Sequence, residues 1–210
     1  MTLSARLSSD DPAVRRIALL ELADDEDEAG LPALVSALST DPAAIVRDEA
    51  ARRLASWDTP EVVDALANAL LDHDTTVRAT AAQSLTELKD PRSGERLLPW
   101  ARHADASVRA AALRALRELR LPAAGEPALE AVASGDAAVR REAVGVLGWL
   151  KRSDALPVLA GLATGDADPE VRRAAVGALG LADGDAGVGS GRGALGSAVT
   201  GAAWPGRGPP

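Results

Sequence analysis

A Val-Arg pair recurs six times along the chain at almost constant spacing. The pairs begin at Val14, Val46, Val77, Val108, Val139 and Val171, and the arginines that follow step by 32, 31, 31, 31 and 32 residues. Small or apolar residues stand four and five places after each Val, and Leu stands eight places after it. A fixed period of this length indicates stacked repeats, in which each unit buries its apolar face against its neighbours.

Each Val belongs to a pattern with helical spacing. The apolar positions 0, 4, 5 and 8, counted from the Val, fall on one stripe of an α-helix. An aspartate three places earlier predicts an N-cap, because its carboxylate accepts hydrogen bonds from the free backbone N–H groups of the first turn. Asp41-Pro42 resembles these caps but lies farther from Val46, so we expect an irregular first turn there. Another helix precedes each of these second helices, and Pro32, Pro60 and Pro91 stand near the starts of three of them.

These patterns divide the chain into six helix pairs and a tail. The expected repeats are about 1–27, 28–58, 59–89, 90–120, 121–151 and 152–182. The first is abbreviated, as a terminal capping repeat is. Residues 183–210 hold nine of the 19 glycines and no apolar period, which predicts a flexible irregular tail. A shifted reading frame is an alternative origin for that tail.

Composition excludes several classes of protein. There is no cysteine, so the chain has no disulfide, thiolate metal site or thiol nucleophile. The formal net charge is −8, which disfavours general affinity for nucleic acid. No apolar run is long enough to span a membrane, and the first residues do not resemble a secretory signal. We expect a cytoplasmic, monomeric, bacterial protein that binds neither membrane nor nucleic acid.

The unit Asp-x-x-Val-Arg-x-x-Ala-Ala-x-x-Leu, seen from Asp74 to Leu85 and closely matched from Asp136 to Leu147, resembles a HEAT repeat. The short period resembles the HEAT-like subclass named after phycobilisome lyases. This resemblance implies an all-α, right-handed α-solenoid of about six helix pairs, with the second helices lining the concave face. In the family, aspartates and arginines commonly bridge adjacent repeats in a ladder. By match, the ladder residues here are Arg15, Arg47, Arg78, Arg109, Arg140 and Arg172 with Asp11, Asp74, Asp105, Asp136 and Asp168.

The sequence shows no catalytic constellation. One branch of the family, a deoxyhypusine hydroxylase, holds iron with His-Glu pairs, but this chain has only His73 and His103 and no such pair. Each histidine has aspartates close by, which allows weak binding of a divalent cation or, more simply, solvated turn positions. No phosphate loop or nucleophile-base pair is present. We therefore expect no catalytic residue, no metal and no cofactor.

A scaffold that binds another protein through its concave face is the leading hypothesis for function. The candidate contact residues are Arg16, Asp48, Arg52, Gln83, Arg114, Arg141 and Arg173. The alternative, which depends on the resemblance alone, is a bilin lyase-like subunit or a chaperone for a chromophore-carrying protein. Because a partly buried charged hydrogen bond is worth more than an exposed ion pair, Arg109→Ala should destabilise the fold more than Arg114→Ala.

Two other features each have two interpretations. The acidic run at residues 24–28 is either a docking site for a basic partner or a solvated loop. Trp57 falls on the apolar stripe and is expected in the core. Trp149 lies one place off the stripe, where it is either an exposed anchor for a partner or partly buried against the next repeat.

Overall fold

The computed structural model describes residues 2–24 and 28–183, and within them the chain forms twelve α-helices and four short 3-10 helices. The first three helix pairs are α1 (Leu3–Leu7) with α2 (Pro12–Asp24), α3 (Leu31–Thr40) with α4 (Ala44–Leu54), and α5 (Pro60–Ala69) with α6 (Thr75–Glu87). The other three are α7 (Pro91–Leu97) with α8 (Ala106–Glu118), α9 (Gly125–Ala131) with α10 (Ala137–Trp149), and α11 (Leu156–Gly165) with α12 (Pro169–Asp183). The 3-10 helices are η1 (Glu28–Gly30), η2 (Pro99–Arg102), η3 (Pro122–Ala124) and η4 (Ser153–Ala155).

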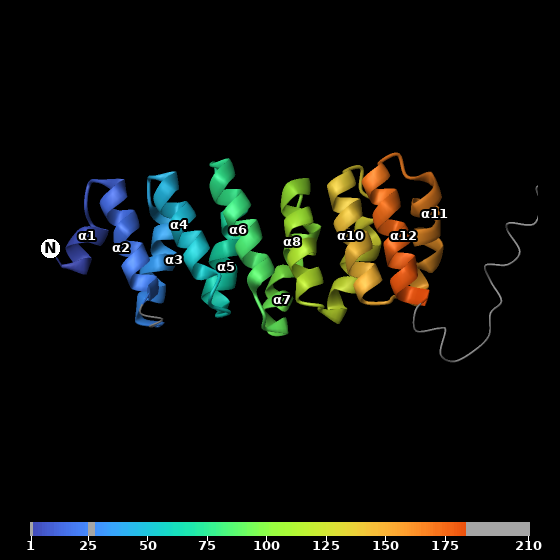
Figure 1. Cartoon of the computed structure of the whole chain (residues 1–210), viewed down its shortest axis with the longest axis horizontal. Helices are drawn as coiled ribbons and strands as arrows, with labels where there is room; N and C mark the ends of the chain where they lie inside the picture. The colour runs from blue at the N-terminus through green and yellow to red at the C-terminus, as the bar shows by residue number, and fades with distance from the viewer. Residues whose placement is uncertain (1, 25–27, 184–210) are drawn as a thin grey trace, which may run out of the picture.

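The helix pairs stack side by side into an elongated array (Figure 1). Each second helix packs against the second helices before and after it, and the first helices form the other layer. No strand occurs in the part of the chain that the structure describes. The expected all-α solenoid of six helix pairs is therefore confirmed, including the short first helix α1.

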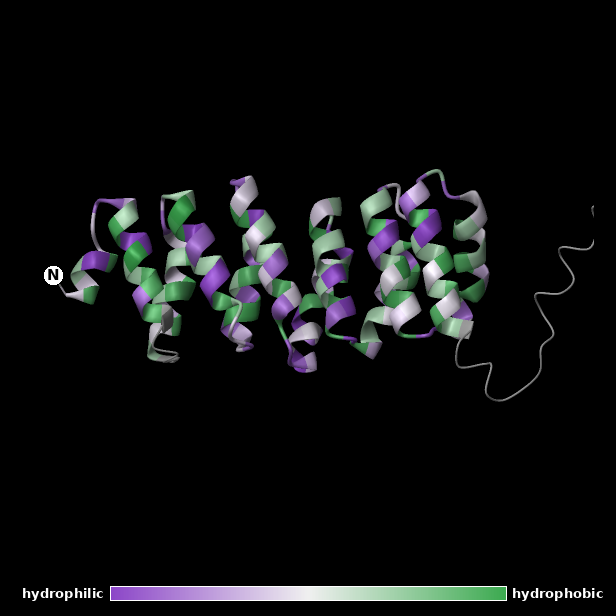
Figure 2. Cartoon of the chain, in the orientation of Figure 1, coloured by the Kyte–Doolittle hydropathy of each residue, from purple (hydrophilic) through white to green (hydrophobic). Residues whose placement is uncertain are grey.

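One apolar core runs through the array between the two layers. Five of the six repeat valines, from Val46 to Val171, are almost completely buried, as are the leucines at Leu54, Leu85 and Leu116. Leucine, valine and alanine supply this core, and Trp57 packs against it while staying partly exposed. Most of the helices carry both hydrophilic and hydrophobic residues, as expected when one stripe is buried and the other is solvated (Figure 2).

Small residues set the distance between neighbouring second helices near the C-terminal end. A Cβ atom added to Gly148 on α10 would lie 2.7 Å from the Cβ of Ala178 on α12. The two helices therefore touch through glycine and alanine, and a larger residue at either position would force them apart.

Two segments singled out in the sequence lie largely outside the described residues. The expected tail at 183–210 does so except for Asp183, which ends α12, and most of the acidic run at 24–28 does so as well. None of the described helices is both long enough and apolar enough to cross a membrane.

Candidate functional site

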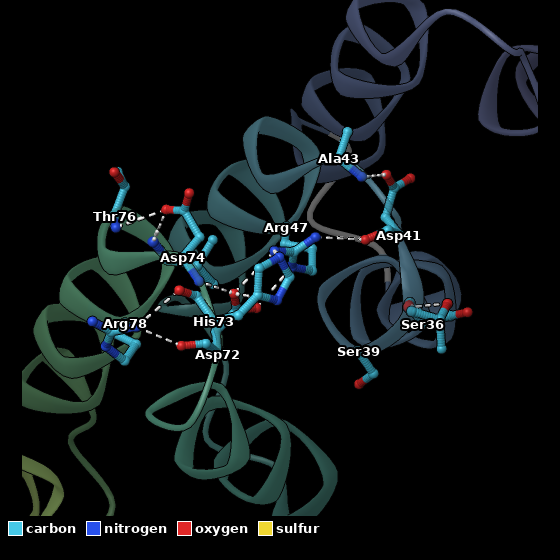
Figure 3. A network of polar contacts seen from close by, with 12 residues as sticks. Ser36, Ser39, Asp41, Ala43, Arg47, Asp72, His73, Asp74, Thr76 and Arg78 are labelled. Carbon is cyan, nitrogen blue, oxygen red and sulfur yellow. Dashed lines mark hydrogen bonds and ion pairs between the residues drawn. The ribbon is translucent and has the colours of Figure 1, made fainter.

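The repeat arginines lie at the starts of the second helices and reach toward the next repeat. Arg47 donates from Nε and Nη2 to the two carboxylate oxygens of Asp72, at 2.7 and 2.9 Å, and from Nη1 to the backbone oxygen of Asp41 at 2.8 Å (Figure 3). Arg15 holds Asp41 in the same two-pronged way, and Arg140 holds Asp166. We call these three arginine–aspartate pairs the closed rungs.

The closed rungs are shielded from water. The side chains of Arg47 and Asp72 are 5% and 9% exposed. Burial by itself would raise the pKa of Asp72, but the hydrogen bonds from Arg47 and from the backbone N–H of Asp74 outweigh it and leave this pKa below its ordinary value. For Asp166 the hydrogen bond from Arg140 has the largest effect and lowers the pKa. Each closed rung is therefore an ion pair at neutral pH.

The aspartates that the sequence analysis assigned to the ladder do not contact the repeat arginines through their carboxylates. They cap the second helices instead: the Oδ1 atom of Asp74 accepts from the backbone N–H groups of Thr76 and Val77 (Figure 3). The same kind of bond, from a backbone N–H group two or three residues later, is accepted by Asp11, Asp105, Asp136 and Asp168. A cap points back into its own helix, so it is not free to bridge to the neighbouring repeat.

The carboxylates that the repeat arginines do bind, Asp41, Asp72 and Asp166, each stand five residues before the Val of the following repeat. This position, which we call the rung position, is occupied by Ser9, Asp41, Asp72, His103, Ser134 and Asp166. Asp41 is therefore a rung residue, and Ala43 stands at the N-cap position of α4 without any side-chain cap. The sequence analysis interpreted Asp41 as a cap with an irregular first turn, because Asp41 stands five residues before Val46 instead of three. That longer spacing is the sequence signal that would have revealed the rung position.

Two rungs in the middle of the array hold no carboxylate. Arg78 donates from Nη1 to the backbone oxygens of Asp72 and His73, and Arg109 donates from Nη1 to those of His103 and Ala104. The only other bond of either guanidinium to a described residue is a long one, 3.5 Å, from Nη2 of Arg109 to the hydroxyl of Ser134. We call these positions, Arg78 with His103 and Arg109 with Ser134, the open rungs.

The second helices also present the contact residues that the sequence analysis proposed. Most of them are tied to neighbours: Arg16 donates to Glu49, Arg52 to Asp48, Arg141 to Glu142, and Gln83 to Glu87. Arg173 pairs with Glu170. Arg114 is exposed and forms no polar contact with any described residue. These residues come from all six second helices and define what we call the second-helix face.

Two buried glutamates beneath this face were not anticipated from the sequence. Glu49 is 2% exposed and is held between Arg16 of the preceding repeat and Arg53 of its own helix. Glu142 is similarly held between Arg117 of the preceding repeat and Arg141. Because a buried carboxylate without a partner is very unfavourable, these clamps fix one second helix against the next.

Of the described tryptophan and histidine side chains, Trp149 and His73 are exposed. Trp149 is 46% exposed, and the guanidinium carbon of Arg120 lies 4.5 Å from its ring centroid, within range of a cation–π contact. His73 is exposed beside Asp72, whereas His103 stacks on Trp100 at 5.8 Å between ring centroids. Within the described residues no three His, Asp or Glu side chains converge in a way that could hold a metal ion.

Comparison with known families agrees with this repeat geometry. The family of HEAT repeats matches residues 1–86, 31–117 and 94–180, which overlap and together span most of the chain. The chain belongs to the HEAT-repeat family. No curated protein matches it.

Solved structures share the fold of this HEAT-repeat protein. An archaeal HEAT-like repeats protein from Thermococcus onnurineus NA1 superposes with a TM-score of 0.63 at 16% identity, covering 87% of this chain and 86% of that one. The complex of CpcE and CpcF of phycocyanin lyase from Nostoc sp. PCC7120 gives 0.52 at 25% identity, covering 87% and 77%. A designed armadillo repeat protein in complex with the peptide (KR)4 gives 0.56 at 19% identity, covering 86% and 98%.

Proposed function

We propose that this HEAT-repeat protein is a non-catalytic adaptor that binds another protein through its second-helix face. The observation that carries the proposal is Arg114, an exposed guanidinium near the middle of the array with no polar partner among the described residues. Ala110 and Ala111 lie one turn earlier on α8, so the charge stands above a floor of small side chains. An unpaired arginine in the middle of a broad face is a residue type that anchors protein interfaces.

The rest of the face supports a mixed-charge partner surface. Arginines and acids alternate across it, and most are already paired within the chain. Such pairs at the rim of an interface set orientation and association rate more than affinity. A hollow of about 560 Å³ lies at the C-terminal ends of α6 and α8, beside the loop that follows α4, and is lined by Glu87, Lys89 and Glu118 among others. It offers room for a partner side chain at that end of the second helices.

Charge reversal tests the adaptor proposal. Arg114→Glu and Arg52→Glu should each remove specific proteins from the set that the tagged chain captures from its native cells, as measured by mass spectrometry. Arg96→Glu is the matched control, because Arg96 is an exposed arginine on α7, in the first-helix layer. Capture of the same set by all three variants and the wild type, with unchanged circular dichroism, would refute the proposal.

A bilin lyase-like subunit is the second candidate, favoured by the likeness to the CpcE–CpcF complex at 25% identity. It would place this chain in the short-repeat subclass named after phycobilisome lyases. Addition of a linear tetrapyrrole to the purified protein separates the two candidates. The adaptor proposal expects no change in the visible absorption of the tetrapyrrole, whereas a chromophore-binding groove expects a shift that saturates with protein.

A further inference from the structure

The open rungs hold two arginine forks in place without a carboxylate partner among the described residues. In Arg78 the Nη1 atom lies 2.7 Å from the backbone oxygen of Asp72, and in Arg109 it lies 2.7 Å from that of His103. The closed rung at Arg47 has the same anchor, at 2.8 Å from the backbone oxygen of Asp41, and uses its remaining Nε and Nη2 atoms for a carboxylate. The open rungs thus share the anchor with the closed rung and lack only the acceptor.

The loops around the open rungs have the same local structure as those around the closed rungs. At a closed rung, Asp72 accepts a hydrogen bond from the backbone N–H of Asp74 at 2.8 Å. At the open rungs, the Nδ1 atom of His103 accepts from the N–H of Asp105 at 3.1 Å, and the hydroxyl of Ser134 accepts from the N–H of Asp136 at 3.2 Å. Histidine and serine therefore satisfy the loop without supplying a charge to the arginine.

Space for a ligand exists at one of the open rungs. A hollow of about 360 Å³ is lined by Arg109, Ser134, Ala101 and Ala131, among others. Arg102 and Glu130 also line it and bind each other at 2.7 Å, so Glu130 is not the missing acceptor. Arg109 and Ser134, the two residues of this open rung, therefore both line the same hollow.

We infer that Arg78 and Arg109 together bind the carboxylates of an acidic peptide segment from a partner protein. The closed rungs show which ligand the fork accepts: a single carboxylate bound through two parallel hydrogen bonds of 2.7–2.9 Å. The negative charge of a nearby cap aspartate does not prevent an arginine fork from binding a carboxylate. Asp74 lies near Arg47, which still binds Asp72, and Asp105 is the equivalent cap beside an open rung.

The spacing of the two forks suits a short peptide. Neighbouring second helices pack about 8–10 Å apart, and the forks occupy equivalent positions on α6 and α8. An extended peptide advances about 3.3 Å per residue, so acidic residues roughly three places apart reach both forks. The open rungs lie at the edge formed by the interhelical loops, distinct from the second-helix face, so this inference stands whether or not that face binds a protein.

Binding of a fluorescein-labelled hexaglutamate, followed by fluorescence anisotropy at low salt, tests the inference. The double variant Arg78→Gln/Arg109→Gln should bind at least about tenfold more weakly, because each fork supplies charge-assisted hydrogen bonds. The matched control, Arg92→Gln/Arg96→Gln, removes the same charge from exposed positions on α7 and should bind as the wild type does.

A second pair of variants separates loss of binding from loss of fold. His103→Asp and Ser134→Asp supply the missing carboxylates from within, so combining them should raise the melting temperature and weaken hexaglutamate binding about tenfold or more. Conversely, Asp72→Ser opens the rung at Arg47 and should strengthen binding.

Equal affinity of the Arg78→Gln/Arg109→Gln double variant and its control would overturn the inference, as would unchanged binding after both rungs are closed. A single-stranded oligonucleotide that binds more tightly than hexaglutamate, with the same dependence on Arg78 and Arg109, would overturn the assignment of the ligand.

Discussion

The closed rung at Arg47 and the open rung at Arg109 differ most in the residue that the next repeat places beside the arginine. Both arginines follow a buried valine at the start of a second helix, and both bind a loop oxygen of their own repeat through Nη1. The residue 25 places later is Asp72 in one case and Ser134 in the other. The comparison teaches that the anchor of the arginine belongs to the repeat fold, whereas the use of its free edge depends on a single loop residue of the next repeat.

The largest expected difference between the two rungs is in stability. Arg47→Ala should lower the free energy of unfolding by about 3 kcal/mol, because it leaves the mostly buried Asp72 without its counter-charge. Arg109→Ala should lower it by only about 1 kcal/mol, because it removes hydrogen bonds to backbone oxygens and strands no carboxylate. Urea denaturation of both variants measures the difference. Equal losses of unfolding free energy in the two variants would show that the bond to the Asp72 carboxylate does not add to the stability that the backbone anchor provides.

The closed rungs should also make the free energy of unfolding depend on pH. The pKa of Asp72 is lower in the folded chain than in the unfolded chain, where it is about 4, so its contribution is complete above that value and is lost as pH falls through the folded pKa. Asp72→Asn should therefore reduce stability by roughly 1–2 kcal/mol at pH 7 and by progressively less below pH 4. Urea melts from pH 7 to pH 2.5 test this, with the exposed Asp64→Asn as control. A deficit that is independent of pH would show that the charge of Asp72 is not what matters.

The smallest expected effect concerns the second-helix face. Arg114→Ala should change the free energy of unfolding by less than about 0.5 kcal/mol, because Arg114 is exposed and makes no polar contact with the described residues. The expected loss of stability is therefore smaller for Arg114→Ala than for Arg109→Ala, which is the order predicted from the sequence. A larger loss than that of Arg109→Ala would mean that Arg114 supports the fold, and would remove the main argument for a partner surface there.

The architecture could be predicted from the sequence because it follows from local patterns. The period of the Val-Arg pairs predicted that the repeats stack, and the apolar stripe predicted which face of each helix is buried. The aspartates three places before Val77 and Val108 predicted the N-caps. The stripe and the caps depend on residues within one helix or its first turn, and the period only requires that the same short pattern recurs. Such short-range relations are visible in a linear pattern.

The partners between repeats were harder to predict because they depend on how two loops meet in space. Arg47 lies closer in sequence to Asp41 and Asp48 than to Asp72, and nothing local indicates which carboxylate it reaches. Glu49 looks like an ordinary solvated residue in the pattern of α4. It is buried because Arg16 of the preceding repeat covers it, a contact that spans 33 residues. Long-range polar pairs of this kind require the packing geometry first.

The rung position has an evolutionary consequence. It lies in an interhelical loop, two residues before the helix cap, and aspartate, histidine and serine all satisfy the same backbone N–H there. A substitution at this position therefore exchanges an internal ion pair for an arginine fork that has no carboxylate partner, while the backbone hydrogen bond of the loop is kept. A gene that grows by duplicating its repeats inherits one such position per unit. Lineages of this protein can thus gain or lose recognition positions one at a time, each at a small and separate cost in stability.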